Sequence, residues 1–180
     1  MKNLTILFLC LTMGNIVFSQ TNGPGYPIPE YPNTPFSYDG NTNSLLPLEK
    51  LLYTKTNRPT SPVTMESLFY VEGTSSKVRF PSKGTISIIA KLKDTDIDPS
   101  EYVMVMKFKV NDHKKRERRE YILSTVSPYH SERAKPQIVQ CIYKKIGDGL
   151  VLLTLNNMEP GEYFVNFESA GNYTYCFGVD

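Results

Sequence analysis

Residues 150–179 show the clearest alternation of apolar runs and turn-forming residues in the chain. Three runs rich in Val, Phe, Tyr, Thr and Leu are separated by residues 158–161 and 170–172. Pro fixes φ, while Gly and Asn accept left-handed backbone, so both gaps favour reversal of the chain. Short runs of this composition are typical of strands. The pattern predicts a three-stranded antiparallel meander.

Two central segments, 85–93 and 101–110, alternate with a period of two. Their even-numbered positions are apolar, and Lys107 and Lys109 lie on the other side of the second segment. Alternation with one polar face predicts half-buried strands. Between these segments, Asp98 followed by Pro99 favours a turn or a single helical turn.

Other short apolar runs predict further strands at 44–53, 67–71, 77–80, 121–126, 138–145 and 150–155. The polar stretches 54–64 and 127–136 contain Pro and predict loops. The charged run 111–120 predicts the tip of a long hairpin. About eight to ten short strands with regular turns indicate a β-sandwich or barrel over 43–180.

The N-terminal segment has the pattern of a secretory signal peptide. Lys2 supplies a positive charge, residues 4–11 are mostly apolar, and Val17 and Ser19 precede Gln20 as small residues. Because the apolar stretch is too short to span a membrane, we expect 1–19 to be removed. The mature protein is then secreted, to the periplasm or the cell surface, without spanning the membrane.

Residues 20–42 contain five prolines among Gly, Asn, Thr and Tyr. This composition favours extended backbone and predicts a Pro-rich N-terminal extension that acts as a flexible tether. A ligand for a Pro-recognising partner is the alternative.

Charge and aromatic content limit the classes of binding partner that we expect. The full chain has a formal net charge of +2, and Lys2 is the single charged residue in 1–19, so the mature chain is nearly neutral. This balance predicts no nucleic-acid partner. Tyr is abundant and Trp is absent. Exposed Tyr rings can stack on sugars, so a carbohydrate-binding module stays open.

Two cysteines remain after removal of the signal peptide, Cys141 and Cys176. An even number in an oxidising compartment permits one disulfide. Cys176 shares a strand face with Thr174 and Gly178, and two buried free thiols are the alternative.

Asp94, Asp96 and Asp98 form the best metal candidate, because alternate carboxylates on a turn offer hard oxygens to Ca²⁺. An EF-hand loop is excluded, since Pro99 and Val105 stand where it needs Gly and a bidentate Glu. A solvated acidic turn is the alternative, and no other cofactor is expected.

The best anion candidate is the basic cluster of the charged run, Lys114, Lys115, Arg116, Arg118 and Arg119. Several cations at a hairpin tip can bind phosphate or sulfate. Glu117 and Glu120 dilute the positive field, and a solubilising turn is the alternative.

Residues 155–163 resemble a recurrent Leu-x-x-Leu-x-Pro-Gly-x-Tyr hairpin of transthyretin-like and immunoglobulin-like sandwich domains in secreted bacterial proteins. The resemblance gives Pro160, Gly161 and Tyr163 structural roles, with a Tyr hydroxyl that ties a loop to the next strand. It implies an all-β, immunoglobulin-like or transthyretin-like antiparallel β-sandwich.

A wider resemblance is to small uncharacterised secreted proteins of Bacteroides-type bacteria. It rests on short segments at 45–50, 78–80, 98–99, 114–116, 160–163 and 177–180. Such a resemblance transfers no activity.

Together these features lead us to expect a secreted, non-enzymatic β-sandwich that acts as a binding or structural component of the cell envelope. Its partner would be an envelope protein or a glycan. A carbohydrate-binding module is the alternative, and a hydrolase ranks third. His113 and His130 lie in polar stretches, and no residue is singled out as catalytic.

Overall fold

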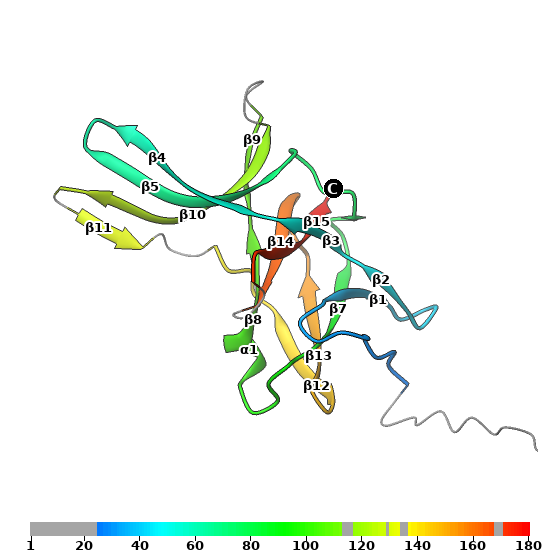
Figure 1. Ribbon diagram of the computed structural model, residues 1–180. Helices are drawn as coiled ribbons and strands as arrows, with labels where there is room; N and C mark the ends of the chain where they lie inside the picture. The colour runs from blue at the N-terminus through cyan, green and yellow to red at the C-terminus, as the bar shows by residue number, and fades with distance from the viewer. Residues whose placement is uncertain (1–24, 113–116, 129, 134–136, 168–170) are drawn as a thin grey trace, which may run out of the picture.

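The computed structural model describes residues 25–112, 117–128, 130–133, 137–167 and 171–180. The signal peptide expected at 1–19 lies outside these residues. Over the described ranges, helices long and apolar enough for a membrane crossing are not found. This part of the chain forms fifteen strands in three sheets and one helical turn, α1 (Pro99–Tyr102) (Figure 1). The all-β expectation is confirmed.

The first sheet, sheet A, consists in spatial order of β12 (Ile142–Gly147), β13 (Leu150–Asn156), β7 (Thr85–Lys91), β1 (Phe36–Asp39) and β2 (Ser44–Pro47). Sheet B consists of β3 (Glu49–Leu52), β15 (Tyr173–Val179), β14 (Gly161–Phe167) and β8 (Val103–Lys107), with β6 (Arg79–Phe80) parallel to β15. Sheet C consists of β11 (His130–Arg133), β10 (Arg118–Ser127), β5 (Thr64–Glu72) and β4 (Thr54–Ser61), with β9 (Lys109–Asn111) also on β10. All pairs other than β6 with β15 are antiparallel.

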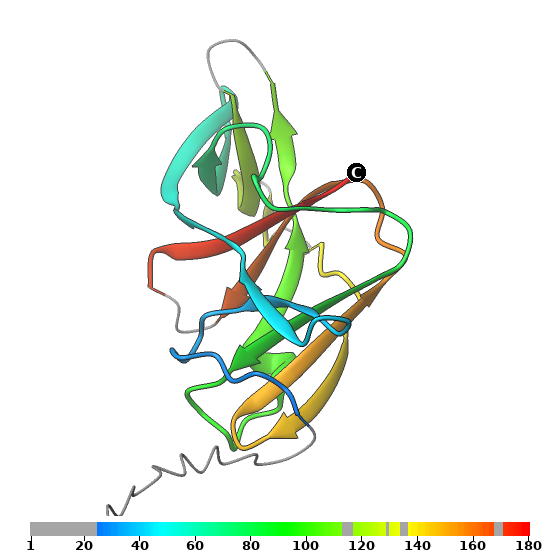
Figure 2. The same cartoon turned by 90° about the vertical axis from the view of Figure 1, so that its right-hand side faces the viewer.

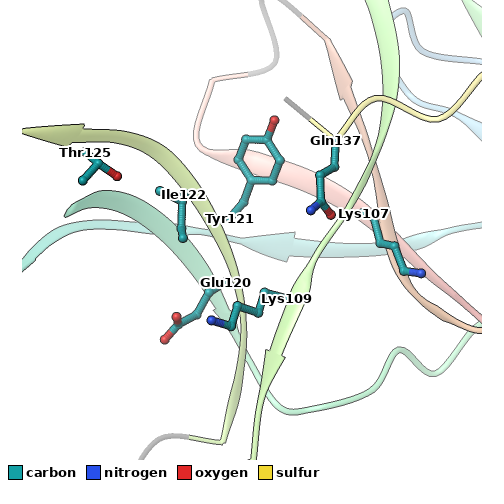
Figure 3. Close-up of a pocket in the computed structure, with 7 residues that line it drawn as sticks. All are labelled: Lys107, Lys109, Glu120, Tyr121, Ile122, Thr125 and Gln137. Carbon is teal, nitrogen blue, oxygen red and sulfur yellow. The ribbon is translucent and has the colours of Figure 1, made fainter. Parts of the chain in front are cut away.

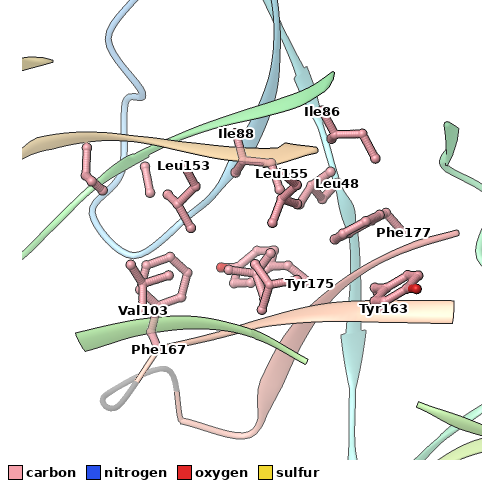
Figure 4. Packing of buried hydrophobic residues seen from close by; sticks show 14 of the residues in the cluster. Leu48, Ile86, Ile88, Val103, Leu153, Leu155, Tyr163, Phe167, Tyr175 and Phe177 are labelled. Carbon is pink, nitrogen blue, oxygen red and sulfur yellow. The ribbon is translucent and has the colours of Figure 1, made fainter. Parts of the chain in front are cut away.

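Sheets A and B pack face to face around the main core. Ile88 and Leu153 enter this core from sheet A, and Val103 and Phe177 enter it from sheet B (Figure 4). All four side chains are fully buried. Leu48 joins β2 to β3, so the chain passes from one sheet to the other through the same core.

Sheet C lies against the opposite face of sheet B, so sheet B is the middle layer. A second cluster there joins Phe69 of β5 to Phe164 of β14 and Cys176 of β15. Beyond this contact, the β4–β5 and β10–β11 hairpins, joined by the pairing of β5 with β10, project from the body as two arms (Figure 1). Figure 2 views the molecule from the side opposite to the arms, so that they point away from the viewer. Because β14 and β15 are covered on both faces, almost all of their residues are buried.

The predicted C-terminal meander is wrong in one connection. β14 pairs with β15 as expected, but β13 pairs with β7 and β12 in sheet A. Residues 157–160 therefore cross between sheets, and Met158 is buried in the main core as they do so. A Pro-Gly step favours a change of direction, but it does not specify which strand becomes the neighbour.

Three segments expected outside the sheets contain strands. β4 lies in the predicted loop 54–64, β11 lies in the predicted loop 127–136, and β1 lies in the predicted tether 20–42. β4 and β11 are edge strands of sheet C. Polar residues and Pro are tolerated on exposed edges, so composition did not reveal them.

Other predictions agree with the structure. The hairpin around the Gly-Asp turn is β12–β13. Asp98 caps α1, because its side chain accepts a hydrogen bond from the Ser100 backbone N–H at 2.9 Å. The Asp-Pro step is thus a single helical turn, as expected.

Candidate functional site

The junction between sheet C and sheet B carries two neighbouring hollows that share Tyr121. The first, which we call the lysine pocket, has a volume of about 230 Å³ and is lined by Lys107, Lys109, Glu120, Tyr121, Ile122, Thr125 and Gln137 (Figure 3). The second, which we call the aromatic groove, has a volume of about 250 Å³. Its walls include Tyr53, Phe69, Tyr121, Asn166 and Thr174.

The lysine pocket exists because two strands separate. β10 pairs with β9 over residues 118–120 and with β11 from Ser124, which leaves 121–123 without a paired strand on that edge among the described residues. A register shift between Ile122 and Ser124 accompanies the change. Figure 3 shows the Tyr121 ring in the space between β10 and the β8–β9 segment. Burial raises the pKa of the Tyr121 hydroxyl.

The aromatic groove is built by three rings, Phe69 of β5, Tyr121 of β10 and Tyr53 at the junction of β3 and β4. The centroid of the Phe69 ring lies 4.9 Å from that of Tyr53 and 5.4 Å from that of Tyr121. The planes are tilted by 47° and 37°, so the rings form a curved wall. The Tyr53 hydroxyl donates to the Gly171 carbonyl at 2.9 Å, which fixes this ring to the start of β15.

Polar groups of the body face the same groove. Thr174 lies on β15, is only 2% exposed, and its Oγ1 forms no hydrogen bond with any residue that the structure describes. Asn166 of β14 adds a half-buried amide. A buried hydroxyl without a partner is costly, so Thr174 is the polar residue of the groove wall that most needs a hydrogen-bond partner.

A cluster around Glu120 holds the arms together. Glu120 is 1% exposed and accepts hydrogen bonds from Arg58 at 2.8 Å, from Arg118 at 2.6 Å and from Asn111 at 3.2 Å. Burial alone would raise the pKa of the Glu120 carboxyl, but these bonds hold it below its ordinary value. The cluster links β4, β9 and β10, and Arg58 also pairs with Glu66 of β5.

A second charged cluster lies on the other face of β10, between sheets B and C. Arg119 is 1% exposed, and its Nη1 lies 3.5 Å from Oε2 of Glu49 and 3.5 Å from Oε2 of Glu162. Its Nε has no hydrogen-bond partner in the described part of the chain. Glu162 also pairs with Arg79. Charge-assisted bonds are usually about 2.7–2.9 Å long, so Arg119 is loosely held compared with Glu120.

The predicted calcium ligands, Asp94, Asp96 and Asp98, are exposed between β7 and α1. Asp98 caps α1, and Asp94 accepts a hydrogen bond from the Asp96 backbone N–H at 3.1 Å. Over the ranges described, no three acidic, His or Cys side chains converge in a way that fits a metal ion. Asp94 and Asp98 accept hydrogen bonds within their own turns, and calcium binding at this segment stays a prediction.

The predicted anion site is only partly visible. Lys114, Lys115 and Arg116 lie outside the described residues. Arg118 and Arg119 are not free cations at a hairpin tip, because each is partly or fully buried and paired with carboxylates. They also point to opposite faces of β10, as successive strand residues must.

The predicted disulfide is absent, and both thiols are free. Cys141 packs against the main core, whereas Cys176 belongs to the cluster between sheets B and C. Sheet B therefore separates the two sulfur atoms. Burial raises the pKa of the Cys176 thiol to about 12.

Residues 160–163 form the corner where the chain passes from sheet A into β14 of sheet B. The Tyr163 hydroxyl donates to the Glu159 carbonyl at 2.8 Å and ties the crossing segment to β14. Gly161 has a φ of 155°, and a Cβ there would lie 2.7 Å from Cε of Lys107. Pro160 is exposed at the corner between the sheets.

The sequence did not single out Tyr53, Tyr121 or Thr174. Tyr53 falls between two strands and Tyr121 opens a run expected to be an ordinary strand. The clearest indication in the sequence was the alternation of side chains along β15, which places Thr174 on the opposite face of the strand from Tyr175 and Phe177.

Comparison with known proteins finds no family model, no curated protein and no solved structure that matches the chain.

Proposed function

We propose that this protein is a secreted, non-enzymatic binding component of the cell envelope, and that it binds through the junction of sheets B and C. The observation that carries the proposal is the aromatic groove with the unpaired Thr174 hydroxyl in its wall. Concave sites with apolar walls and a few convergent polar groups are typical of ligand binding.

The arms extend this surface. Met65 of β5 and Val126 of β10 are neighbours across the two strands, and both side chains are exposed. Leu123 is exposed at the rim of the groove. Exposed apolar residues beside a groove favour contact with a larger partner, an envelope protein or a glycan.

The fold proposed with this function is an immunoglobulin-like or transthyretin-like sandwich formed by sheets A and B. Support comes from their face-to-face packing and from the Tyr163 hydrogen bond to Glu159, which resembles the tie expected from the sequence. Sheet C is then an addition that carries the binding region.

The experiment measures sedimentation of the purified mature protein, residues 20–180, with an envelope fraction of the producing cells. Leu123→Trp narrows the groove at an exposed rim position, so we expect it to lose binding and still fold. Ile142→Trp is the matched control on the outer edge of sheet A, where the side chain is 59% exposed. Equal binding by both variants, or no binding by the wild type, contradicts the proposal.

A further inference from the structure

The aromatic groove has the dimensions of a site for one small ring. Its volume of about 250 Å³ is close to the lower end, about 300 Å³, of small-molecule sites. The curved wall of Tyr53, Phe69 and Tyr121 encloses a single ring better than it would support a flat chain.

The chemistry of the groove is divided between its two sides. Tyr53, Phe69 and Tyr121 form the aromatic wall, while sheet B adds Met106 and Phe167 together with the Asn166 amide and Thr174, whose buried Oγ1 has no partner among the described residues. A pyranose ring has the matching division, with C–H groups on its faces and hydroxyls on its rim. Aromatic rings favour the C–H face, and the hydroxyl and amide can exchange hydrogen bonds with the rim.

An apolar occupant fits less well. It would leave the Thr174 Oγ1 buried without a hydrogen bond, which is the state seen within the described residues. A cationic occupant also fits poorly, because Lys55 brings a positive charge to the groove and, among the residues that the structure describes, no carboxylate lines it.

We infer that the aromatic groove binds one pyranose ring of a glycan, stacked on Tyr121 and Tyr53 and hydrogen-bonded to Thr174 and Asn166. The inference rests on the proposed function, since it names the ligand class of the same site. The Tyr53 hydroxyl donates its hydrogen bond to the Gly171 carbonyl. The ring of Tyr53, and not its hydroxyl, is therefore the part that contacts the sugar.

The test is saturation-transfer NMR on the mature protein with methyl glycosides of glucose, galactose, mannose and N-acetylglucosamine at millimolar concentration. We expect transfer to the ring C–H protons of at least one glycoside. Thr174→Val keeps the shape and removes the hydroxyl, so it should weaken binding about three- to tenfold. Thr154→Val, the same change on a half-buried residue of sheet A, should leave binding unchanged.

Tyr121→Ala should abolish the transfer, because it removes the stacking surface. Absence of transfer to every glycoside with the wild-type protein overturns the inference. So does an affinity that is the same for wild type, Thr174→Val and Tyr121→Ala. Since Thr174→Val is close in shape to wild type, it tests the inference even if Tyr121→Ala fails to fold.

Treatment of the envelope fraction separates this inference from the proposed function. If periodate, which cleaves vicinal diols, abolishes sedimentation of wild-type protein and protease does not, the ligand is a glycan. If protease abolishes it and periodate does not, the ligand is a protein, so the sugar inference fails while the binding function stands. Glycoside binding without sedimentation would sustain the sugar site and contradict the envelope role.

Discussion

The two faces of sheet B are buried by different means. Towards sheet A, β15 presents Tyr175, Phe177 and Val179 to a continuous apolar core. Towards sheet C, the same strand presents Thr174 and Cys176 to a layer that contains aromatic rings, buried charges and two hollows. One strand therefore serves a packed interface on one side and an open one on the other.

This difference between the two faces of sheet B suits them to different roles, one in stability and the other in the proposed binding. In the main core the Tyr163 hydroxyl is hydrogen-bonded to the Glu159 carbonyl, and the apolar side chains specify the arrangement of sheets A and B. The face towards sheet C holds buried polar groups with incomplete hydrogen bonding, Thr174 Oγ1 and Arg119 Nε. Such groups lower stability, which is why we propose this face of sheet B, and not the one towards sheet A, as the binding face.

Phe177→Ala should have the largest effect. The ring is fully buried in the main core and stacks on Tyr163 with centroids 5.5 Å apart. We expect a loss of about 3–5 kcal/mol in the free energy of unfolding, measured by urea denaturation. A loss below about 1 kcal/mol would contradict the assignment of this face as the stabilising core.

Glu120→Gln should cost about 3 kcal/mol, because it leaves Arg58 and Arg118 without their shared buried carboxylate. The native pKa of Glu120 lies below the ordinary 4.5. Its stabilising contribution is therefore complete above pH 4.5 and is lost as the pH falls through the native value. Denaturation midpoints between pH 3 and 7 should fall less steeply in acid for the variant, and parallel profiles would refute the role of this carboxylate.

Tyr163→Phe should cost about 1 kcal/mol, since it removes the hydroxyl that donates to the Glu159 carbonyl and keeps the ring in the core. Thermal and urea denaturation measure the change. An unchanged midpoint would remove the structural tie at this corner.

Thr174→Val should have the smallest effect on stability, a change of less than about 1 kcal/mol or a slight gain, because it replaces an unpaired buried hydroxyl by a methyl group. Calorimetry of the variant beside Thr154→Val provides the comparison. A loss near 2 kcal/mol would mean that the hydroxyl is bonded within the native protein, and the groove would lose its main distinguishing feature.

Local sequence patterns predicted the strands whose burial is one-sided or whose turns are distinctive. The β12–β13 hairpin and the Asp98-capped turn are examples. The alternation of apolar and polar residues did not predict which faces of the strands in sheet B, the middle layer, are buried. In β8 the even-numbered face was expected to be the buried one, but Val103 and Val105 fill the main core while Met106 packs towards sheet C. A pattern of one polar face is lost when both faces are covered.

The candidate site was less accessible from sequence than the fold. The groove joins Tyr53, Tyr121 and Thr174, which are far apart in the chain and come together only when sheet C packs on sheet B. The charged run was expected at the tip of a long hairpin; β9 pairs with β10 over three residues on either side of the tip, and 113–116 lie outside the described residues. Its Arg119 and Glu120 are nevertheless buried structural residues, a role that composition does not reveal because burial depends on the neighbouring sheet.

The most direct test of the account is a paired measurement on Thr174→Val, of unfolding free energy and of sedimentation with the envelope fraction. We predict unchanged or slightly raised stability together with weakened binding, while Thr154→Val keeps wild-type binding. A variant that is destabilised and binds as well as wild type would show that the hydroxyl is structural, and that the face of sheet B towards sheet C is not the binding face.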